Sequence, residues 1–162
     1  AKNQDPKEFG KLFDTISVCL SKGLGAPIGS VLLADKKTIH RALRIRKILG
    51  GGMRQVGYLA AAGIYALDHN IERLAEDHRR AKELAVVLQS KDWVATVEPV
   101  ETNILIFTLT PQVNESQLIE KLKQKNILIS SMGQGKLRMV THLDYREVMH
   151  TYVIETLEKL AI

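Results

Sequence analysis

Hydrophobic residues near the start of the chain gather in two short runs separated by glycines. The runs at Val18–Leu20 and Val31–Leu33 have the length and composition of β-strands. Between them lies SKGLGAPIG, in which three glycines and a proline interrupt any regular element. The pattern therefore predicts two buried strands, with Lys22 at the point where the chain leaves the first strand and begins to return.

Helical periodicity follows these strands in two segments. Asp35 is the expected N-cap of a basic helix that runs to about Leu49, where glycines 50–52 end it. Over residues 55–88, apolar side chains recur at alternating intervals of three and four, which predicts one very long helix. Within it, the LAAAG sequence at residues 59–63 offers small side chains on which a backbone of the same chain or of a second subunit can pack.

The pattern changes near residue 91, where short apolar runs begin to alternate with amphipathic stretches. Strands are expected at residues 94–97, 104–109, 127–129 and 136–140, and helices at residues 114–124 and 146–160. This order predicts a small sheet packed under two helices. We therefore expect an α/β protein with one domain over residues 1–90 and a smaller α+β domain over residues 91–162.

Composition limits the class of protein. Of the 162 residues, 45% are hydrophobic and 25% are charged, which is the balance of a soluble globular protein. The single cysteine, Cys19, lies in the first apolar run, so we expect a buried thiol and a reducing compartment. No apolar run approaches the ~20 residues of a membrane span, and the first ten residues lack the apolar core of a secretory signal. These features predict a cytoplasmic protein with no membrane partner.

Lys22 is the first candidate for chemistry. A lysine beside glycines in a turn is commonly a solvated surface residue. In the alternative, partial burial at a strand end lowers the pKa of the amine and favours the neutral nucleophile of Schiff-base chemistry. Glycines on either side of Leu24 would also let backbone approach a flat aromatic cofactor. The residues alone leave both alternatives open.

The basic segment RIRKILGGGMRQ, residues 44–55, is the second candidate. Lys47 and Arg54 flank the glycine turn, and Arg54 is expected at the start of the next helix, where free N–H groups and the helix dipole favour a phosphate. The net charge of +5 and pI of about 9.4 also permit nucleic acid. A nucleic-acid surface would interleave aromatic residues, and only Tyr58 is near, so we expect no nucleic-acid partner.

Arg138, in the sequence KLRMVTH, is the third candidate. It alternates with apolar neighbours on a short strand, so it faces either solvent or an inter-domain cleft. In a cleft, its planar guanidinium can bind a carboxylate through two hydrogen bonds. His142 is expected to be a structural hydrogen-bonding residue, and the sequence predicts no metal site.

Four segments occur in the same order, at compatible spacing, in a known enzyme family. They are SVCLSKGLGAPIGS, RKILGGGMRQ, AAAGIYAL and LRMVTHLD. Through them nearly the whole chain resembles the low-specificity L-threonine aldolases, a branch of the β-eliminating lyases of fold type I, which use pyridoxal phosphate. The resemblance implies that residues 1–90 are the C-terminal part of the large cofactor-binding domain and that residues 91–162 are the small C-terminal domain.

The resemblance also implies roles for individual residues. Lys22 resembles the lysine that forms the internal aldimine with the cofactor, and Arg138 resembles the arginine that binds the substrate carboxylate. Lys47 and Arg54 resemble the pair that reaches the cofactor phosphate of a neighbouring subunit, which implies a homo-oligomer, a dimer or tetramer, with shared active sites. The implied reaction cleaves L-threonine or L-allo-threonine into glycine and an aldehyde.

One part of the family pattern does not match this chain. The family places the acid for the pyridinium nitrogen, a phosphate-binding turn and a ring over the cofactor well before the lysine. Only 21 residues precede Lys22 here, and neither Asp5 nor Asp14 lies in the family's setting for that acid. We therefore expect a C-terminal portion of an aldolase that is inactive alone. The alternative is a non-catalytic domain that binds anions or a partner chain through basic residues 36–54.

Overall fold

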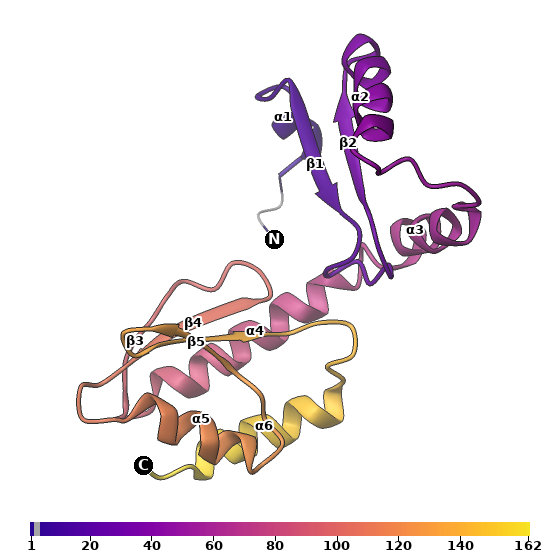
Figure 1. The fold of residues 1–162 in the computed structure, drawn as a ribbon. Helices are drawn as coiled ribbons and strands as arrows, with labels where there is room; N and C mark the ends of the chain where they lie inside the picture. Colours follow the sequence, from indigo (N-terminus) through magenta and orange to yellow (C-terminus); the bar gives the residue numbers. More distant parts are fainter. Residues whose placement is uncertain (2–3) are drawn as a thin grey trace. The chain divides into compact units, whose positions relative to one another are not determined.

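The computed structural model describes Ala1 and residues 4–162, and the chain divides into two compact units between Glu72 and Arg73. The sequence places the boundary near residue 91. The structure differs because helix α4 (Leu74–Gln89) packs on the sheet of the C-terminal unit. The expectation of one helix over residues 55–88 is wrong, since α3 (Gly57–His69) ends before α4 begins (Figure 1).

The N-terminal unit combines a β-hairpin with short helices. Its elements are α1 (Pro6–Gly10), β1 (Thr15–Cys19), β2 (Ser30–Ala34), α2 (Lys36–Ile48) and α3. The two strands pair antiparallel, with Val18 opposite Val31, and within the described residues no third strand joins them. The predicted return of the chain after Lys22 is thereby confirmed.

The strands of this hairpin are not buried as the sequence predicts. Leu32 and Leu33 are 40% and 51% exposed, and Cys19 is exposed as well. A two-stranded sheet offers too little surface to bury its own apolar side chains. Burial is instead concentrated in a small cluster of Leu20 and Ala26 from the hairpin loop with Ala66 of α3.

Asp35 begins helix α2 in the predicted way. Its carboxylate accepts a hydrogen bond from the Thr38 backbone N–H at 2.6 Å, which makes it the N-cap. This hydrogen bond stabilises the ionised carboxylate and lowers the pKa of Asp35 below its usual value.

No helix in the described part of the chain combines the length and the apolar character needed to cross a bilayer.

The C-terminal unit is a four-stranded antiparallel sheet with three helices. After α4 come β3 (Val94–Val97), β4 (Ile104–Leu109), α5 (Glu115–Lys123), β5 (Ser130–Gly133), β6 (Lys136–Val140) and α6 (Glu147–Lys159). The strands lie in the order β3–β4–β6–β5. The expected strand at residues 127–129 is wrong because the Ile127 N–H instead donates to the Leu122 carbonyl at 2.9 Å and closes α5, after Asn126 with φ of 58°.

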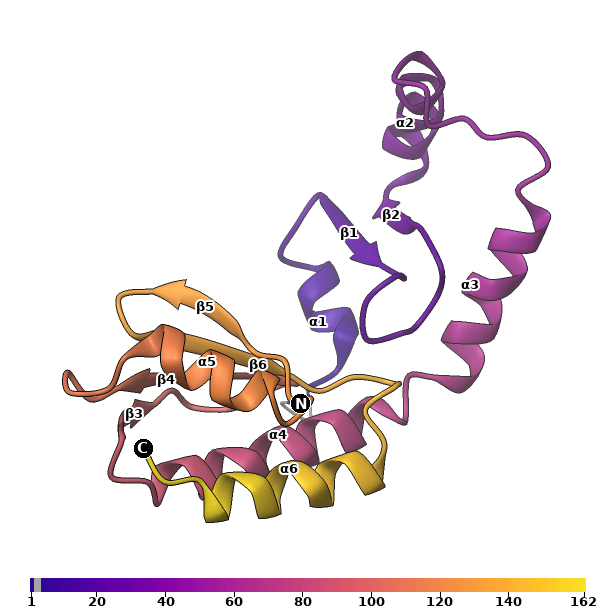
Figure 2. The same ribbon diagram turned by 60° about the horizontal axis from the view of Figure 1, so that its bottom comes forward.

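The three helices of this unit lie on one face of its sheet (Figures 1 and 2). Leu137 of β6 and Phe107 of β4 point into the core at 0% and 1% exposure, where Leu122 of α5 and Leu157 of α6 join them. Trp93 packs edge-on against Phe107, with 6.4 Å between ring centroids. The opposite sheet face carries Arg138.

We expect Leu137→Ala to destabilise the C-terminal unit by about 2–5 kcal/mol, because a buried leucine loses its transfer free energy and leaves a cavity. Urea unfolding followed by the fluorescence of Trp93, the single tryptophan, reports on this unit. The matched control Val86→Ala, at a position 66% exposed, should change the unfolding free energy by less than about 0.5 kcal/mol. Equal effects of the two substitutions would contradict this assignment of the core.

Candidate functional site

The loop between β1 and β2 holds Lys22 in a tight turn. The Gly25 N–H donates to the Lys22 carbonyl at 2.9 Å, in the pattern of a β-turn. The Leu20 N–H donates to the Gly29 carbonyl at 2.9 Å and closes the hairpin end. Gly25 and Gly29 have φ of 75° and 113°, which strain any residue with a Cβ. The glycines that interrupt the apolar runs therefore shape the lysine loop.

Helix α3 supports this loop from within the same unit. The Asn70 side-chain amide donates to the Leu24 carbonyl at 2.7 Å. Gly63 is buried, and a Cβ at this position would lie only 3.2 Å from Cδ1 of Leu20. Gly63, the last residue of the LAAAG sequence, therefore packs on Leu20 of the same chain, whereas Ala60 and Ala61 are exposed.

The Lys22 side chain itself is exposed. Within the described residues, its amine makes no hydrogen bond and no ion pair. Of the two alternatives that the residues leave open, a solvated turn lysine and a partly buried one, the structure shows the exposed side chain, because the small cluster of Leu20, Ala26 and Ala66 leaves the tip of the turn uncovered. An aldehyde can therefore approach the amine from solvent.

Lys47 lies in the last turn of α2, beside the glycine turn. The Gly50 N–H donates to the Lys47 carbonyl at 3.2 Å, and the Gly51 N–H donates to the Arg46 carbonyl at 2.8 Å, which is the Schellman pattern of a helix end. A Cβ at Gly52 would lie 2.8 Å from Cδ of Lys47. The aliphatic part of Lys47 thus lies against bare backbone, so the glycines direct this side chain as well as ending the helix.

Arg54 lies before α3 rather than in its first turn, since the helix begins at Gly57. Its side chain is exposed, and among residues 4–162 neither it nor Lys47 has a charged or hydrogen-bonding partner for its side chain. The N-cap, Val56, makes no side-chain hydrogen bond, so the first N–H groups of α3 lack a side-chain partner. Free N–H groups beside an unpaired cation favour an anion such as phosphate.

Arg138 lies in the middle of β6, opposite Ser130 on β5 and Ile106 on β4. Its neighbours Leu137 and Met139 are buried, so the guanidinium extends from the face that the helices leave open. In the described structure the guanidinium has no hydrogen-bond or ion-pair partner. Its planar fork of donors is therefore available to bind a carboxylate.

The end of the strand that carries Arg138 is anchored on α4. The Thr141 hydroxyl donates to the Asp77 carbonyl at 2.7 Å. Further along the same segment, the Arg80 guanidinium donates to the Tyr145 carbonyl. Both bonds join the segment after β6 to a long helix of the same unit, which limits the movement of the strand end.

A polar network that the sequence analysis missed joins α4 to α6. Arg79 donates to Glu83 at 2.8 and 2.9 Å and to Glu147 at 2.8 Å. These hydrogen bonds hold the pKa of both carboxyl groups below the usual glutamate value. Buried His150 lies 2.7 Å from Glu83 through Nε2 and 3.2 Å from the Tyr145 hydroxyl through Nδ1, and burial raises the pKa of Tyr145 to about 12. Only the i,i+4 spacing of Arg79 and Glu83 is visible in the sequence.

His142 makes a local hydrogen bond in the segment after β6. Its Nδ1 accepts the Asp144 backbone N–H at 3.2 Å, as expected for a structural histidine. Within Ala1 and residues 4–162, no three His, Cys, Asp or Glu side chains lie close enough together to hold a metal ion.

The predicted site residues divide between the two units. Lys22, Lys47 and Arg54 belong to the N-terminal unit, and Arg138 belongs to the C-terminal unit. All four side chains are exposed. The backbone at these residues belongs to a turn, a helix end or a paired strand. The four side chains comprise one exposed amine, two cations suited to phosphate and one suited to carboxylate.

Comparison with known proteins identifies relatives of this chain. A family model described as β-eliminating lyase matches residues 1–111. The low-specificity L-threonine aldolase of Escherichia coli strain K12 is 46% identical over 138 residues, which cover 85% of this chain and 40% of that protein. The chain spans about two fifths of the length of the curated relatives that it matches.

Solved structures share the fold at low sequence identity. A crystal structure from Exiguobacterium sp. 255-15, named as an aromatic amino acid β-eliminating lyase/threonine aldolase, has a TM-score of 0.75 and 18% identity, and the match covers 96% of this chain and 47% of that one. A variant of the cystine C–S lyase C-DES with glycine covalently linked to its pyridoxal phosphate has a TM-score of 0.50 and 16% identity, with 65% and 28% covered. These likenesses confirm the predicted fold class, that of the fold-type-I enzymes.

The comparisons also confirm the resemblance to low-specificity L-threonine aldolases. The matched family segment, residues 1–111, includes the turn with Lys22 and the glycine turn between Lys47 and Arg54. The chain belongs to the β-eliminating lyase family.

Proposed function

We propose that this chain is part of a pyridoxal-phosphate-dependent aldolase that cleaves L-threonine and L-allo-threonine into glycine and an aldehyde. The observation that carries the proposal is the exposed, unpaired amine of Lys22 on a glycine-shaped turn, inside the segment that matches the β-eliminating lyase family. The identity to threonine aldolases supports the choice of substrate class.

The donor set of the N-terminal unit fits this cofactor. The amine of Lys22 suits a covalent bond to the cofactor aldehyde, and the cations of Lys47 and Arg54 suit its phosphate. When bound, pyridoxal phosphate supplies an electron sink for the pair released at the substrate Cα. The exposure of all three side chains leaves them accessible to such a group.

Arg138 has the separate task of orienting the substrate. Its guanidinium would bind the substrate carboxylate through two parallel hydrogen bonds, which fixes the rotation of the amino acid about its Cα. Because Thr141 and the chain beyond it are anchored on α4, the strand that carries Arg138 keeps its position. Orientation of the Cα–Cβ bond is the contribution that this residue makes to cleavage.

The proposal includes a homo-oligomer in which Lys47 and Arg54 reach the cofactor phosphate of a neighbouring subunit. Both side chains are exposed, and the same stretch exposes apolar residues, with Ile48 at 72% and Leu49 at 79%. Exposed apolar residues beside cations suit a surface that a second subunit covers. Localisation in the cytoplasm is part of the proposal as well, supported by the single cysteine.

A second candidate function is anion binding without catalysis through residues 36–54. This segment contains no acidic residue, and in the described structure the side chains of its lysines and arginines form no ion pair. Under this alternative Lys22 would have no special reactivity. Chemical labelling of Lys22 therefore distinguishes the two functions.

We expect borohydride reduction of the full-length protein, with pyridoxal phosphate bound, to attach a pyridoxyl group to Lys22. Lys22 is expected to react because it presents an accessible, unpaired amine. Peptide mapping by mass spectrometry locates the label, and Lys22→Ala should remove it while Lys37→Ala leaves it in place. The 162-residue chain alone should be labelled well below one pyridoxyl group per chain and should release no glycine from L-threonine.

A pyridoxyl label on another lysine of the full-length protein would refute the assignment of Lys22.

We expect Arg138→Lys to lower kcat/KM for L-threonine about thirtyfold, or about 2 kcal/mol, in the full-length enzyme. An ammonium cannot reproduce the two parallel hydrogen bonds of a guanidinium. Steady-state kinetics measure the effect, and the control Arg146→Lys makes the same chemical change in the same unit. Unchanged kinetics in the Arg138 variant would rule out the carboxylate-binding role.

We expect inactive Arg54→Ala and Lys22→Ala full-length subunits to regain activity when they are mixed. If Arg54 acts across the interface, each mixed dimer contains one intact site, so about a quarter of all sites recover at equal mixing. Glycine release measures the recovery. A mixture of Lys22→Ala with the double variant Lys22→Ala, Arg54→Ala provides the control and should stay inactive. Absence of recovery, with subunit exchange demonstrated, would argue against the shared site.

A further inference from the structure

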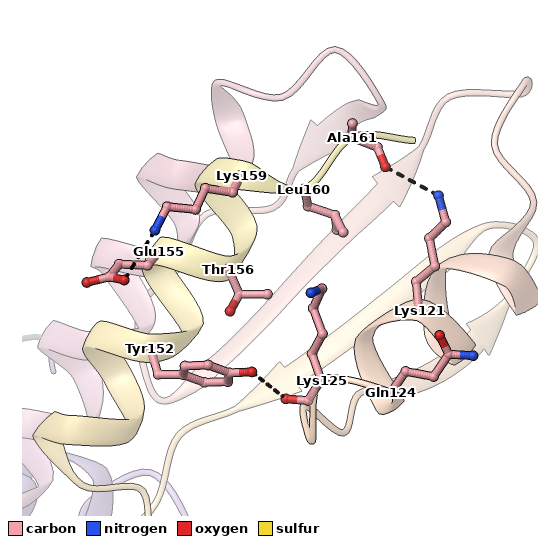
Figure 3. Close-up of a pocket in the computed structure, with 9 residues that line it drawn as sticks. All are labelled: Lys121, Gln124, Lys125, Tyr152, Glu155, Thr156, Lys159, Leu160 and Ala161. Atoms are coloured by element: carbon pink, nitrogen blue, oxygen red, sulfur yellow. Dashed lines mark hydrogen bonds and ion pairs between the residues drawn. The ribbon is translucent and has the colours of Figure 1, made fainter.

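The C-terminal unit contains a depression that none of the residues discussed above occupies. It lies between the C-terminal ends of α5 and α6, has a volume of about 710 Å3, and falls within the range of about 300–1,000 Å3 that is typical of small-molecule pockets (Figure 3). Its wall includes Lys121, Lys125, Thr156 and Leu160. We propose that this depression binds a small phosphate monoester.

The wall of the depression is held in place by contacts between separate elements. The Tyr152 hydroxyl on α6 donates to the Lys125 carbonyl, just beyond α5, at 3.0 Å. On the other side, Nζ of Lys121 on α5 donates to the Ala161 carbonyl at 3.3 Å. These two bonds cross the depression at different points, so its shape exists before any ligand binds.

Lys125 is the group that points to a ligand. Tyr152 fixes its backbone, while its side chain extends into the space between the helices toward Thr156 and Leu160 (Figure 3). Within the described residues the Lys125 ammonium has no hydrogen-bond or ion-pair partner, and the Thr156 hydroxyl has none either. Lys125 thus brings a cation without an acceptor into this space, and Thr156 of α6 lines the same depression.

The electrostatic balance of the depression is positive. Lys159 pairs with Glu155 at 3.4 Å, so these two charges offset each other and leave Lys121 and Lys125. The ends of α5 and α6 each contribute about half a negative charge through the helix dipole. Summed over the lining side chains and the two helix ends alone, the charge is about +1, which favours an anion. The Lys121 ammonium donates a hydrogen bond to a carbonyl near the end of the chain, which accounts for its position. The Lys125 ammonium has no such partner in the described residues.

The chemistry of the donors favours a phosphate over a carboxylate. Lys121 and Lys125 border the depression at the end of α5 and Thr156 borders it on α6, and this arrangement suits the several oxygens of a tetrahedral group. A planar carboxylate is better matched by the fork of an arginine, and no arginine lines the depression. The Leu160 side chain and the Tyr152 ring supply an apolar wall for the carbon skeleton of a monoester (Figure 3).

Titration of the 162-residue chain with glycerol 3-phosphate, followed by the amide NMR signals of Lys125 and Thr156, tests the proposal. At physiological ionic strength we expect saturable shifts at both signals and about tenfold weaker binding in Lys125→Gln, as expected for the loss of one charge-assisted hydrogen bond. Thr156→Val should weaken binding by a smaller factor. Lys123→Gln removes the same charge from the same helix end outside the depression and should leave the affinity unchanged.

Three outcomes would overturn the proposal. Equal weakening by Lys123→Gln and Lys125→Gln would indicate unspecific attraction to a basic surface. Binding of acetate as tight as that of glycerol 3-phosphate would refute the preference for phosphate. An absence of saturable shifts at Lys125 and Thr156, in a spectrum that shows the C-terminal unit folded, would exclude the site itself.

Discussion

Burial of only one face of the four-stranded sheet determines where the charged groups of the C-terminal unit can lie. Successive side chains on a strand alternate between faces, so the inward positions of Leu137 and Met139 require Arg138 and Val140 to point outward. A shift of one residue in the register of β6 would bury the guanidinium and expose the leucine. The apolar core therefore specifies the position of the cation that we assign to carboxylate binding.

The same unit ties its two long helices together through charge as well as packing. Arg79 bridges Glu83 of its own helix and Glu147 of α6, and buried His150 adds a second link to Glu83. Exposed ion pairs of this kind contribute little individually. Here they help to hold α4 and α6 in position. A backbone carbonyl of α4 also accepts a hydrogen bond from the Thr141 hydroxyl, which fixes the end of the strand that carries Arg138. Helix α4, the network around Arg79 and strand β6 together therefore hold the backbone of Arg138 in place.

Local rules predict much of this structure, and non-local packing accounts for what they miss. The cap at Asp35 and the return of the chain after Lys22 follow from short-range chemistry, and both are found. The break between α3 and α4 is not visible in the apolar periodicity, because the two helices belong to different units. The exposure of Cys19 likewise depends on how many neighbours a strand has, which its own sequence does not specify.

The exposure of the N-terminal site residues has a further physical consequence. Two unit charges 4 Å apart interact by about 1 kcal/mol in water but by about 4 kcal/mol at the effective dielectric constant of a partly buried site. Lys47 and Arg54 are exposed and would therefore hold a phosphate weakly in the surroundings described here. Tight cofactor binding requires more protein around these cations, and the relatives are more than twice as long as this chain. The proposed neighbouring subunit would supply such a covering and, by excluding water, would strengthen the same contacts without changing a residue.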